Sequence, residues 1–168
     1  MIFKVGDRVV HPMYGVGSIV KLETKQLGEQ AAHVYYEVAT SKSTIWVPVD
    51  ALTTGLRPLT AKSHLAQYRS LLKSSPVPLN KDHHERHIEL TERLREGTFQ
   101  AKCEIVRDLT AHSWHKRLSE ADASLLRVAR EGLCQEWAAV KGVTMFEATH
   151  EVDEILQESK RTRSAEID

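Results

Sequence analysis

The chain has 168 residues, enough for one large domain or two small ones, and 41% of them are hydrophobic, as in ordinary globular proteins. Its 23 basic and 23 acidic residues cancel, which excludes the strongly basic composition of a domain that binds nucleic acid by net charge alone. Any contact with DNA must therefore be local, or must draw part of its affinity from a protein partner.

The N-terminal part of the chain is typical of short β-strands. β-branched and aromatic residues gather in segments separated by turn residues, at 5–10, 16–22, 33–39, 44–49 and 56–59. Several short strands joined by tight turns predict a small antiparallel β-barrel. We therefore expect a first domain over residues 1–59.

From Thr60 onward, apolar residues recur with helical spacing. Thr60 is predicted to cap a first helix, which ends before Pro76 because proline cannot continue a helix. A second helix is expected to start near Asn80 or Asp82 and to end at Gly97, a residue type that favours helix C-termini.

Three further helices are expected. The third starts from about Thr98, and the fourth follows Ser119, the first residue of a sequence that resembles a capping box. Gly142 ends the fourth helix and Thr144 caps the fifth. The chain is thus predicted to be an α+β protein of two domains, with an all-α bundle of about five helices over 60–160. The chain is expected to fray after Gln157. Its last residues, 161–168, are expected to form a charged tail.

Cys103 and Cys134 lie in segments predicted to be helical, where they are expected to be small core residues and not nucleophiles or disulfide partners. The opening sequence lacks the pattern of a signal peptide. No window approaches the roughly 20 apolar residues that a membrane span requires. These features predict a soluble, cytoplasmic protein.

The string His83-His84-Glu85-Arg86-His87 is the candidate for metal chemistry. The zinc-protease pattern H-E-x-x-H is not met, because His87 follows Glu85 one residue too early. His83 and His87 lie one helical turn apart, but a tetrahedral site needs one or two further ligands, which no spacing supplies. A polar helix face is favoured, with a small metalloenzyme as the alternative. No phosphate-binding or nucleophile motif is present, so we predict no enzyme, no metal and no cofactor.

Each half of the chain carries a set of recognisable motif residues. They are residues 1–7, 28–30 and 47–48 in the first half, and Glu104–Leu109 followed by Leu118-Ser119 in the second. In these residues the chain resembles the CarD family of bacterial transcription regulators, and the second set is similar to the family's V-V-R-D-L…L-S pattern. The resemblance covers residues 1–160 in the same order. The first strand alone is shared with the polymerase-interacting domain of transcription-repair coupling factors, and the helical half makes the resemblance to CarD specific.

The resemblance implies a Tudor-like (SH3-like) barrel that binds the RNA polymerase β subunit. It assigns this contact to Lys25, Leu27, Trp46 and Val47, with Lys25 standing where the family often has arginine. Side chains alternate along a strand, so Trp46 is exposed if Ile45 and Val47 face the core. The alternatives for Trp46 are an interface anchor or a core residue.

The resemblance also implies a helical domain that contacts promoter DNA at the upstream edge of the transcription bubble and stabilises the open complex. The family's wedge tryptophan, at the start of the second helix, falls on His83, whose ring can stack on a base but offers less apolar area. Lys81, Arg86 and His87 are predicted phosphate contacts. Lys116 and Arg117 form a second basic pair, for which a DNA contact and a solvated loop are equally open.

Acidic residues interrupt this patch, so we expect weak intrinsic DNA affinity with little sequence specificity, raised by attachment to polymerase.

Trp114 and Trp137 are assigned to helix packing. A monomer, associated with the nucleoid through polymerase, is expected. The alternative function is a Tudor-like adaptor without DNA contact. Its aromatic cage would draw on Tyr14, Tyr35, Tyr36 and Trp46, although Tyr35 and Tyr36 alternate and cannot share a face.

Overall fold

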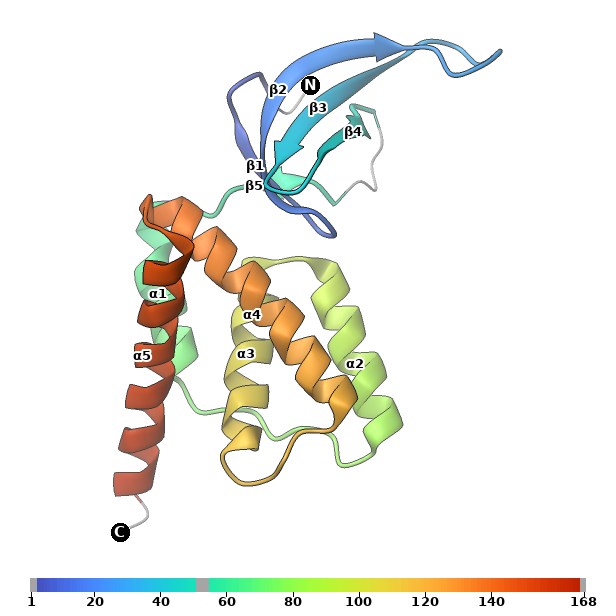
Figure 1. Ribbon diagram of the computed structural model, residues 1–168. Coiled ribbons are helices and arrows are strands. Elements are labelled where there is room, and N and C mark those ends of the chain that lie inside the picture. Colours follow the sequence, from blue (N-terminus) through green and yellow to red (C-terminus); the bar gives the residue numbers. More distant parts are fainter. Residues whose placement is uncertain (1–2, 51–54, 167–168) are drawn as a thin grey trace. The chain divides into compact units, whose positions relative to one another are not determined.

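The computed structural model describes residues 3–50 and 55–166. The chain divides into two compact units, Met1–Leu59 and Thr60–Asp168. Each unit is taken by itself below, and Figure 1 labels the elements of both.

The N-terminal unit is an antiparallel sheet in the order β4-β3-β2-β1-β5. Its strands are β1 (Arg8–His11), β2 (Gly15–Lys25), β3 (His33–Thr40), β4 (Thr44–Pro48) and β5 (Arg57–Pro58). Figure 1 shows β2 and β3 as a long curved pair. The predicted fold class, an antiparallel β unit followed by a helical unit, is confirmed. The first strand starts at Arg8 and not at Val5, because Gly6, at a φ of 95°, turns the chain before it.

The core of the sheet is formed by one face of strands β1 to β4. Its buried members are Val9, Ile19, Tyr36, Val38 and Val47. The period-two alternation of a strand therefore directs Trp46 and its cross-strand neighbour Glu37 to the outer face. The two faces of the sheet thus have separate roles, one for packing and one open to contacts.

The C-terminal unit contains the predicted helices. They are α1 (Leu65–Lys73), preceded by the short 3-10 helix η1 (Lys62–His64), then α2 (His83–Glu96), α3 (Phe99–Ser113), α4 (Glu120–Lys141) and α5 (Met145–Ala165). The side chains of Asp82, Thr98, Ser119 and Thr144 accept hydrogen bonds from the backbone at the first turns of α2 to α5. Ser119 and Thr144 were predicted as caps, and Asp82 and Thr98 as the approximate starts of their helices.

Two expectations for this unit are wrong at the ends of helices. Thr60 does not cap a helix; its N–H and Oγ1 donate to Glu136 Oε1 at 3.2 and 2.7 Å, and α1 begins only at Leu65. The charged tail does not fray after Gln157, because α5 continues to Ala165. Arg163 Nη2 donates to the carbonyl of Lys73 at 2.9 Å and thereby holds the last turns of α5 against the end of α1.

The helical core is centred on α3 and α4. Trp137 on α4 is fully buried, with its ring centroid 6.2 Å from that of Phe99. Cys103 and Cys134 are buried in the same core, and burial raises the pKa of both thiols, as expected for packing residues. Trp114 differs from the prediction. It caps the end of α3, stays half-exposed, and is not among the residues packed on the core.

Within the described ranges, no helix is both long enough and apolar enough to cross a lipid bilayer.

Candidate functional site

Trp46 and Lys25 meet on the outer face of the N-terminal sheet. Trp46 is 44% exposed, which removes the core alternative for this residue. The ammonium nitrogen of Lys25 lies 3.7 Å from the centroid of the indole ring, a cation–π contact. The indole Nε1 donates to Glu23 Oε2 at 3.1 Å. The ring is therefore held in place from its face and from its edge, and we call this cluster the Lys25–Trp46 face.

Glu23 connects the charges of this face. Its carboxylate lies 3.5 Å from the ammonium groups of both Lys21 and Lys25. Desolvation alone would raise the pKa of Glu23, but the hydrogen bond from Trp46 and the two lysines outweigh it and lower the pKa. The face thus combines a fixed aromatic ring with two cations and one anion. Glu23 is absent from the predicted contacts, although its period-two spacing with Lys21 and Lys25 was a signal for it.

The other two predicted polymerase contacts lie apart from this pair. Leu27 is 62% exposed, beyond the end of β2. Val47 is only 5% exposed and packs in the sheet core, so its side chain cannot meet a partner. β4 is an edge strand of the described sheet, so one row of its backbone N–H and C=O groups is not paired with a neighbouring strand.

The aromatic cage of the adaptor alternative is not assembled around Trp46. Tyr36 is buried in the sheet core, where its hydroxyl accepts a hydrogen bond from the N–H of Phe3 at 3.1 Å. Tyr14 lies beside His11 at the turn between β1 and β2, with ring centroids 5.1 Å apart. A methyl-lysine cage needs three or four converging rings, and Tyr36 faces away from Trp46.

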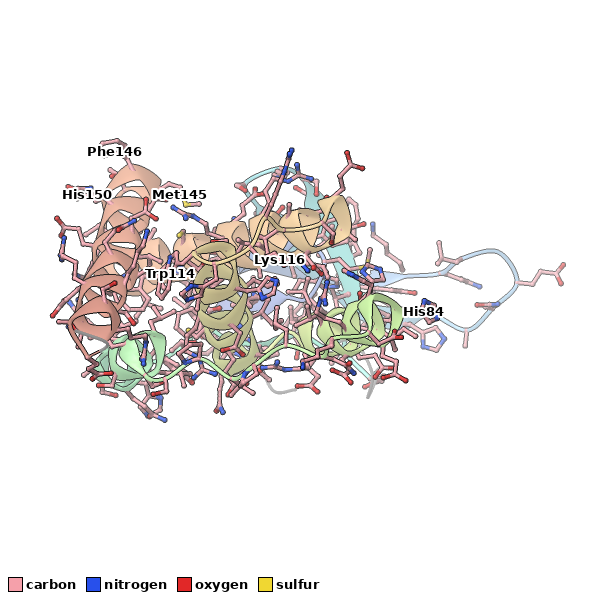
Figure 2. All side chains as sticks on the ribbon, turned by 90° about the horizontal axis from the view of Figure 1, so that it is seen from below. His84, Trp114, Lys116, Met145, Phe146 and His150 are labelled. Carbon is pink, nitrogen blue, oxygen red and sulfur yellow. The ribbon has the colours of Figure 1, made fainter. Side chains whose placement is uncertain are left out.

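In the helical unit, most of the predicted DNA contacts line one hollow, which we call the His83 hollow. It is formed at the start of α2 and in the connection between α3 and α4, by Leu79, Asn80, Lys81, His83, Arg86, His112, Lys116, Arg117, Ser119 and Asp122. Figure 2 looks onto this end of the helical unit and labels Lys116 and His84. The structure thus brings the basic pair Lys116-Arg117 beside His83. His87 is exposed but does not line the hollow.

Arg86 has a different role from the one predicted. Its side chain is 6% exposed, and Nε and Nη2 donate to Asp122 Oδ2 at 3.1 and 2.7 Å. Nη1 donates to the carbonyl of Asn80 at 2.9 Å, and Nη2 lies 2.8 Å from Nδ1 of His83. Arg86 therefore does not contact a phosphate, because its guanidinium is directed at internal acceptors.

This arrangement fixes the ring of His83. A guanidinium only donates hydrogen bonds, so Nδ1 of His83 accepts from Arg86 and the ring proton resides on Nε2. Arg86 is thus a positioning residue for the exposed imidazole.

Asp122 balances the charge of Arg86 in this network. Burial alone would raise its pKa, but hydrogen bonds from Arg86 and Ser119 and the charge of Arg86 outweigh burial and lower it. Within 3–50 and 55–166, Lys81, Lys116 and Arg117 form no ion pair. Glu85 and Glu89 both accept from the side-chain amide of Asn80, but neither lines the hollow, and among the described residues that line it Asp122 is the acidic one. The hollow therefore carries a local positive charge although the whole chain is neutral.

The metal alternative finds no ligand set. Nδ1 of His83 is already engaged by Arg86. In the part of the chain that the structure describes, no three His, Cys, Asp or Glu side chains are placed to hold a metal ion together.

Comparisons with known proteins agree along the chain. Residues 3–60 match the family described as the CarD-like/TRCF RID domain, and residues 68–153 match the CarD C-terminal domain. The chain is also similar to the putative transcription factor YdeB of Bacillus subtilis, with 28% identity over 144 residues. That similarity covers 84% of this chain and 94% of the relative.

Proposed function

The chain belongs to the CarD family of transcription regulators that act on RNA polymerase, and we propose that it binds the polymerase β subunit and promoter DNA with different units. Residues 1–59 bind the β subunit. Residues 60–160 contact the upstream edge of the transcription bubble and stabilise the open promoter complex. In this proposal the protein acts in the cytoplasm, on polymerase that is bound to the nucleoid. It acts as a monomer and needs no cofactor.

The Lys25–Trp46 face supports the polymerase contact. An exposed tryptophan whose ring is held on one face by Lys25 and at its edge by Glu23 is a large, rigid anchor, and tryptophan is enriched among residues that dominate binding energy. Leu27 adds exposed apolar surface beyond β2. The edge strand β4 offers backbone groups for pairing with a strand of the partner.

The His83 hollow supports the DNA contact and is the observation on which the proposal depends most. It presents a fixed imidazole beside three cations that form no ion pair in the described chain, Lys81, Lys116 and Arg117. Lysine and arginine position a protein on phosphates without reading sequence, while a planar ring can stack on a base exposed at a fork. His87, exposed on α2 outside the hollow, is proposed as a peripheral phosphate contact.

Because the chain is neutral overall, the DNA contact on its own is weak and sensitive to salt. Attachment to polymerase raises the effective concentration of the helical unit at the promoter. The proposal therefore makes the polymerase contact a condition for the DNA contact.

Replacing Trp46 with alanine is expected to weaken binding to the isolated β subunit about thirtyfold, equivalent to ~2 kcal/mol, because an interface anchor is lost. Biolayer interferometry with the full chain measures this. Tyr14→Ala is the matched control, since Tyr14 is an exposed aromatic residue of the same unit that lies outside the Lys25–Trp46 face. Equal affinities for wild type and Trp46→Ala are the result that contradicts the contact.

Replacing His83 with tryptophan is expected to lengthen, and with alanine to shorten, the lifetime of open promoter complexes, each about fivefold. Stacking on a base is worth ~1–3 kcal/mol, and indole offers more area than imidazole. The measurement is the decay of open complexes after addition of a competitor. His84→Ala controls for charge and exposure, because His84 is the neighbouring exposed histidine and does not line the hollow. Lifetimes unchanged in both His83 variants would leave the adaptor without DNA contact as the better description.

A further inference from the structure

Trp114 is a large aromatic side chain of the helical unit that the proposed function does not use. It follows α3 directly, is half-buried, and does not pack on the hydrophobic core. Within the described residues, its indole N–H has no hydrogen-bond partner. A large ring in this position contributes little to the core, and its role must lie in what it faces.

Trp114 faces a groove between the connection of α1 to α2, the end of α3 and the end of α5. We call it the Trp114 groove. Its walls include Val77, Pro78 and Leu79 on one side, Trp114 on another, and Lys160 and Arg163 from α5. The groove is mostly apolar between basic side chains. Figure 2 labels Trp114, which follows the end of α3.

The wall that contains Val77 is held in place by buried charged side chains. The N–H of Val77 donates to Asp108 Oδ1 at 3.0 Å. Asp108 is itself paired with Arg107, whose Nε lies at 2.8 Å and whose Nη1 donates to Ser74 Oγ at 2.9 Å. The groove is therefore built on a fixed segment, and the carboxylate of Asp108 is neutralised by Arg107 and does not repel an anion.

Once Asp108 is paired with Arg107, the remaining charged side chains that line the groove, Lys160 and Arg163, are positive. Neither Lys160 nor Arg163 forms an ion pair within residues 3–50 and 55–166. Arg163 donates only to neutral oxygens, the carbonyl of Lys73 and the hydroxyl of Ser75, and its Nε is buried without a hydrogen-bond partner. An apolar peptide would leave both cations without an anion, whereas a phosphate would complement them. The combination favours a nucleic-acid ligand.

We infer that the Trp114 groove binds a nucleotide of single-stranded DNA, with the base stacked on the indole ring and the phosphate near Lys160 and Arg163. Sequence-tolerant binding of single strands uses this pair of features, aromatic rings for bases and cations for the backbone. The inference rests on the proposed function and extends it. The groove and the His83 hollow share Leu79 and His112, so a strand unpaired at His83 continues into the groove.

The experiment uses the full chain at low salt and three fluorescent probes of equal length: an oligothymidylate, a duplex, and a duplex with a single-stranded arm. Trp114→Ala is expected to weaken binding of the oligothymidylate and of the forked probe about tenfold by fluorescence anisotropy, and to leave the duplex unchanged. Trp114→Phe is expected to retain most of the affinity, because a ring remains. Lys160→Gln is expected to reduce the salt dependence of single-strand binding.

Phe146→Ala is the matched control. Phe146 is an aromatic residue that is 82% exposed, but it lies at the start of α5, about 20 Å along the helix axis from Lys160. Figure 2 shows it well apart from Trp114. Its replacement is expected to leave all three affinities unchanged.

Single-strand binding that is unchanged in Trp114→Ala overturns the inference. If His83→Ala still weakens binding to the forked probe in that experiment, the proposed function stands and only the groove is wrong. If Trp114→Ala instead loses affinity for polymerase and keeps its affinity for DNA, the groove binds polypeptide, which also overturns the inference. A wild-type chain that binds none of the three probes overturns the inference, whereas the proposed function, in which the DNA contact depends on attachment to polymerase, is tested separately by the lifetime of open complexes.

Discussion

Replacing Arg86 with alanine is expected to lower the free energy of unfolding of the helical unit by about 3–5 kcal/mol. The guanidinium and its partner Asp122 have side chains only 6% and 3% exposed. The substitution leaves a buried carboxylate without its cation and the carbonyl of Asn80 without its donor. Urea unfolding followed by far-ultraviolet circular dichroism measures the change.

Arg93→Ala on the same helix is the matched control. Arg93 pairs with Glu104, but the two side chains are 33% and 25% exposed, and pairs of this kind contribute about 1 kcal/mol or less. A cost for Arg86→Ala no greater than for Arg93→Ala would show that the buried pair does not hold α2 to α4.

The same pair makes the unit sensitive to acid in a defined direction. The pKa of Asp122 is lowered in the folded chain, so the unfolded chain binds more protons as the pH falls. The contribution of the pair is complete above the ordinary pKa of an aspartate and is lost as the pH falls through the lowered one. The stability of the wild type should therefore decline more steeply below about pH 4 than that of Asp122→Asn.

Replacing Trp137 with alanine is expected to destabilise the helical unit by about 3–5 kcal/mol, because it leaves a cavity in the core. Trp137 is fully buried, packs near Phe99, and donates through Nε1 to Glu151 at 3.1 Å. The loss of the ring also leaves this carboxylate with one donor fewer. Urea unfolding of the purified variant measures the effect.

Trp114→Ala is the control for Trp137→Ala, because it removes the same side chain from a half-exposed position outside the core. It is expected to cost about 1 kcal/mol or less. Similar losses of stability in the two variants would mean that Trp114 packs like a core residue. The same unfolding curve also shows whether Trp114→Ala is folded, which the DNA-binding measurements above require.

The two stability predictions separate structural from functional effects at the His83 hollow. Arg86→Ala is expected to alter DNA binding as well, since the ring of His83 loses the donor that orients it. His83→Ala leaves the pair of Arg86 with Asp122 intact and should change open-complex lifetime without a large change in stability.

The elements of this fold could be predicted because their signals are local. A helix begins where a short polar side chain accepts the free N–H groups of the first turn, and Asp82, Thr98, Ser119 and Thr144 occupy these positions. It ends at Gly97 or Gly142, both at a φ of 71°. The expectations for Thr60 and for the end of α5 failed because their partners, Glu136 and Lys73, are distant in sequence.

Part of the Lys25–Trp46 face could be predicted from the sequence for the same reason. Alternation along a strand is a property of the backbone, so the exposure of Trp46 followed from the burial of Val47 on the opposite face. The contact of Lys25 with the indole ring was not readable, because it crosses from β2 to β4 and depends on the register of the strands between them.

By itself, the sequence determined the α+β class, the order of the elements, the helix caps and the resemblance to the CarD family, since each depends on neighbouring residues. Only the tertiary structure decided which basic side chains are exposed and which are buried in ion pairs. Arg86 and Lys81 look alike in the sequence, but Asp122, 36 residues away on α4, makes Arg86 a buried positioning residue. The same packing carries Lys116 and Arg117 to His83 and leaves Trp114 in a basic groove.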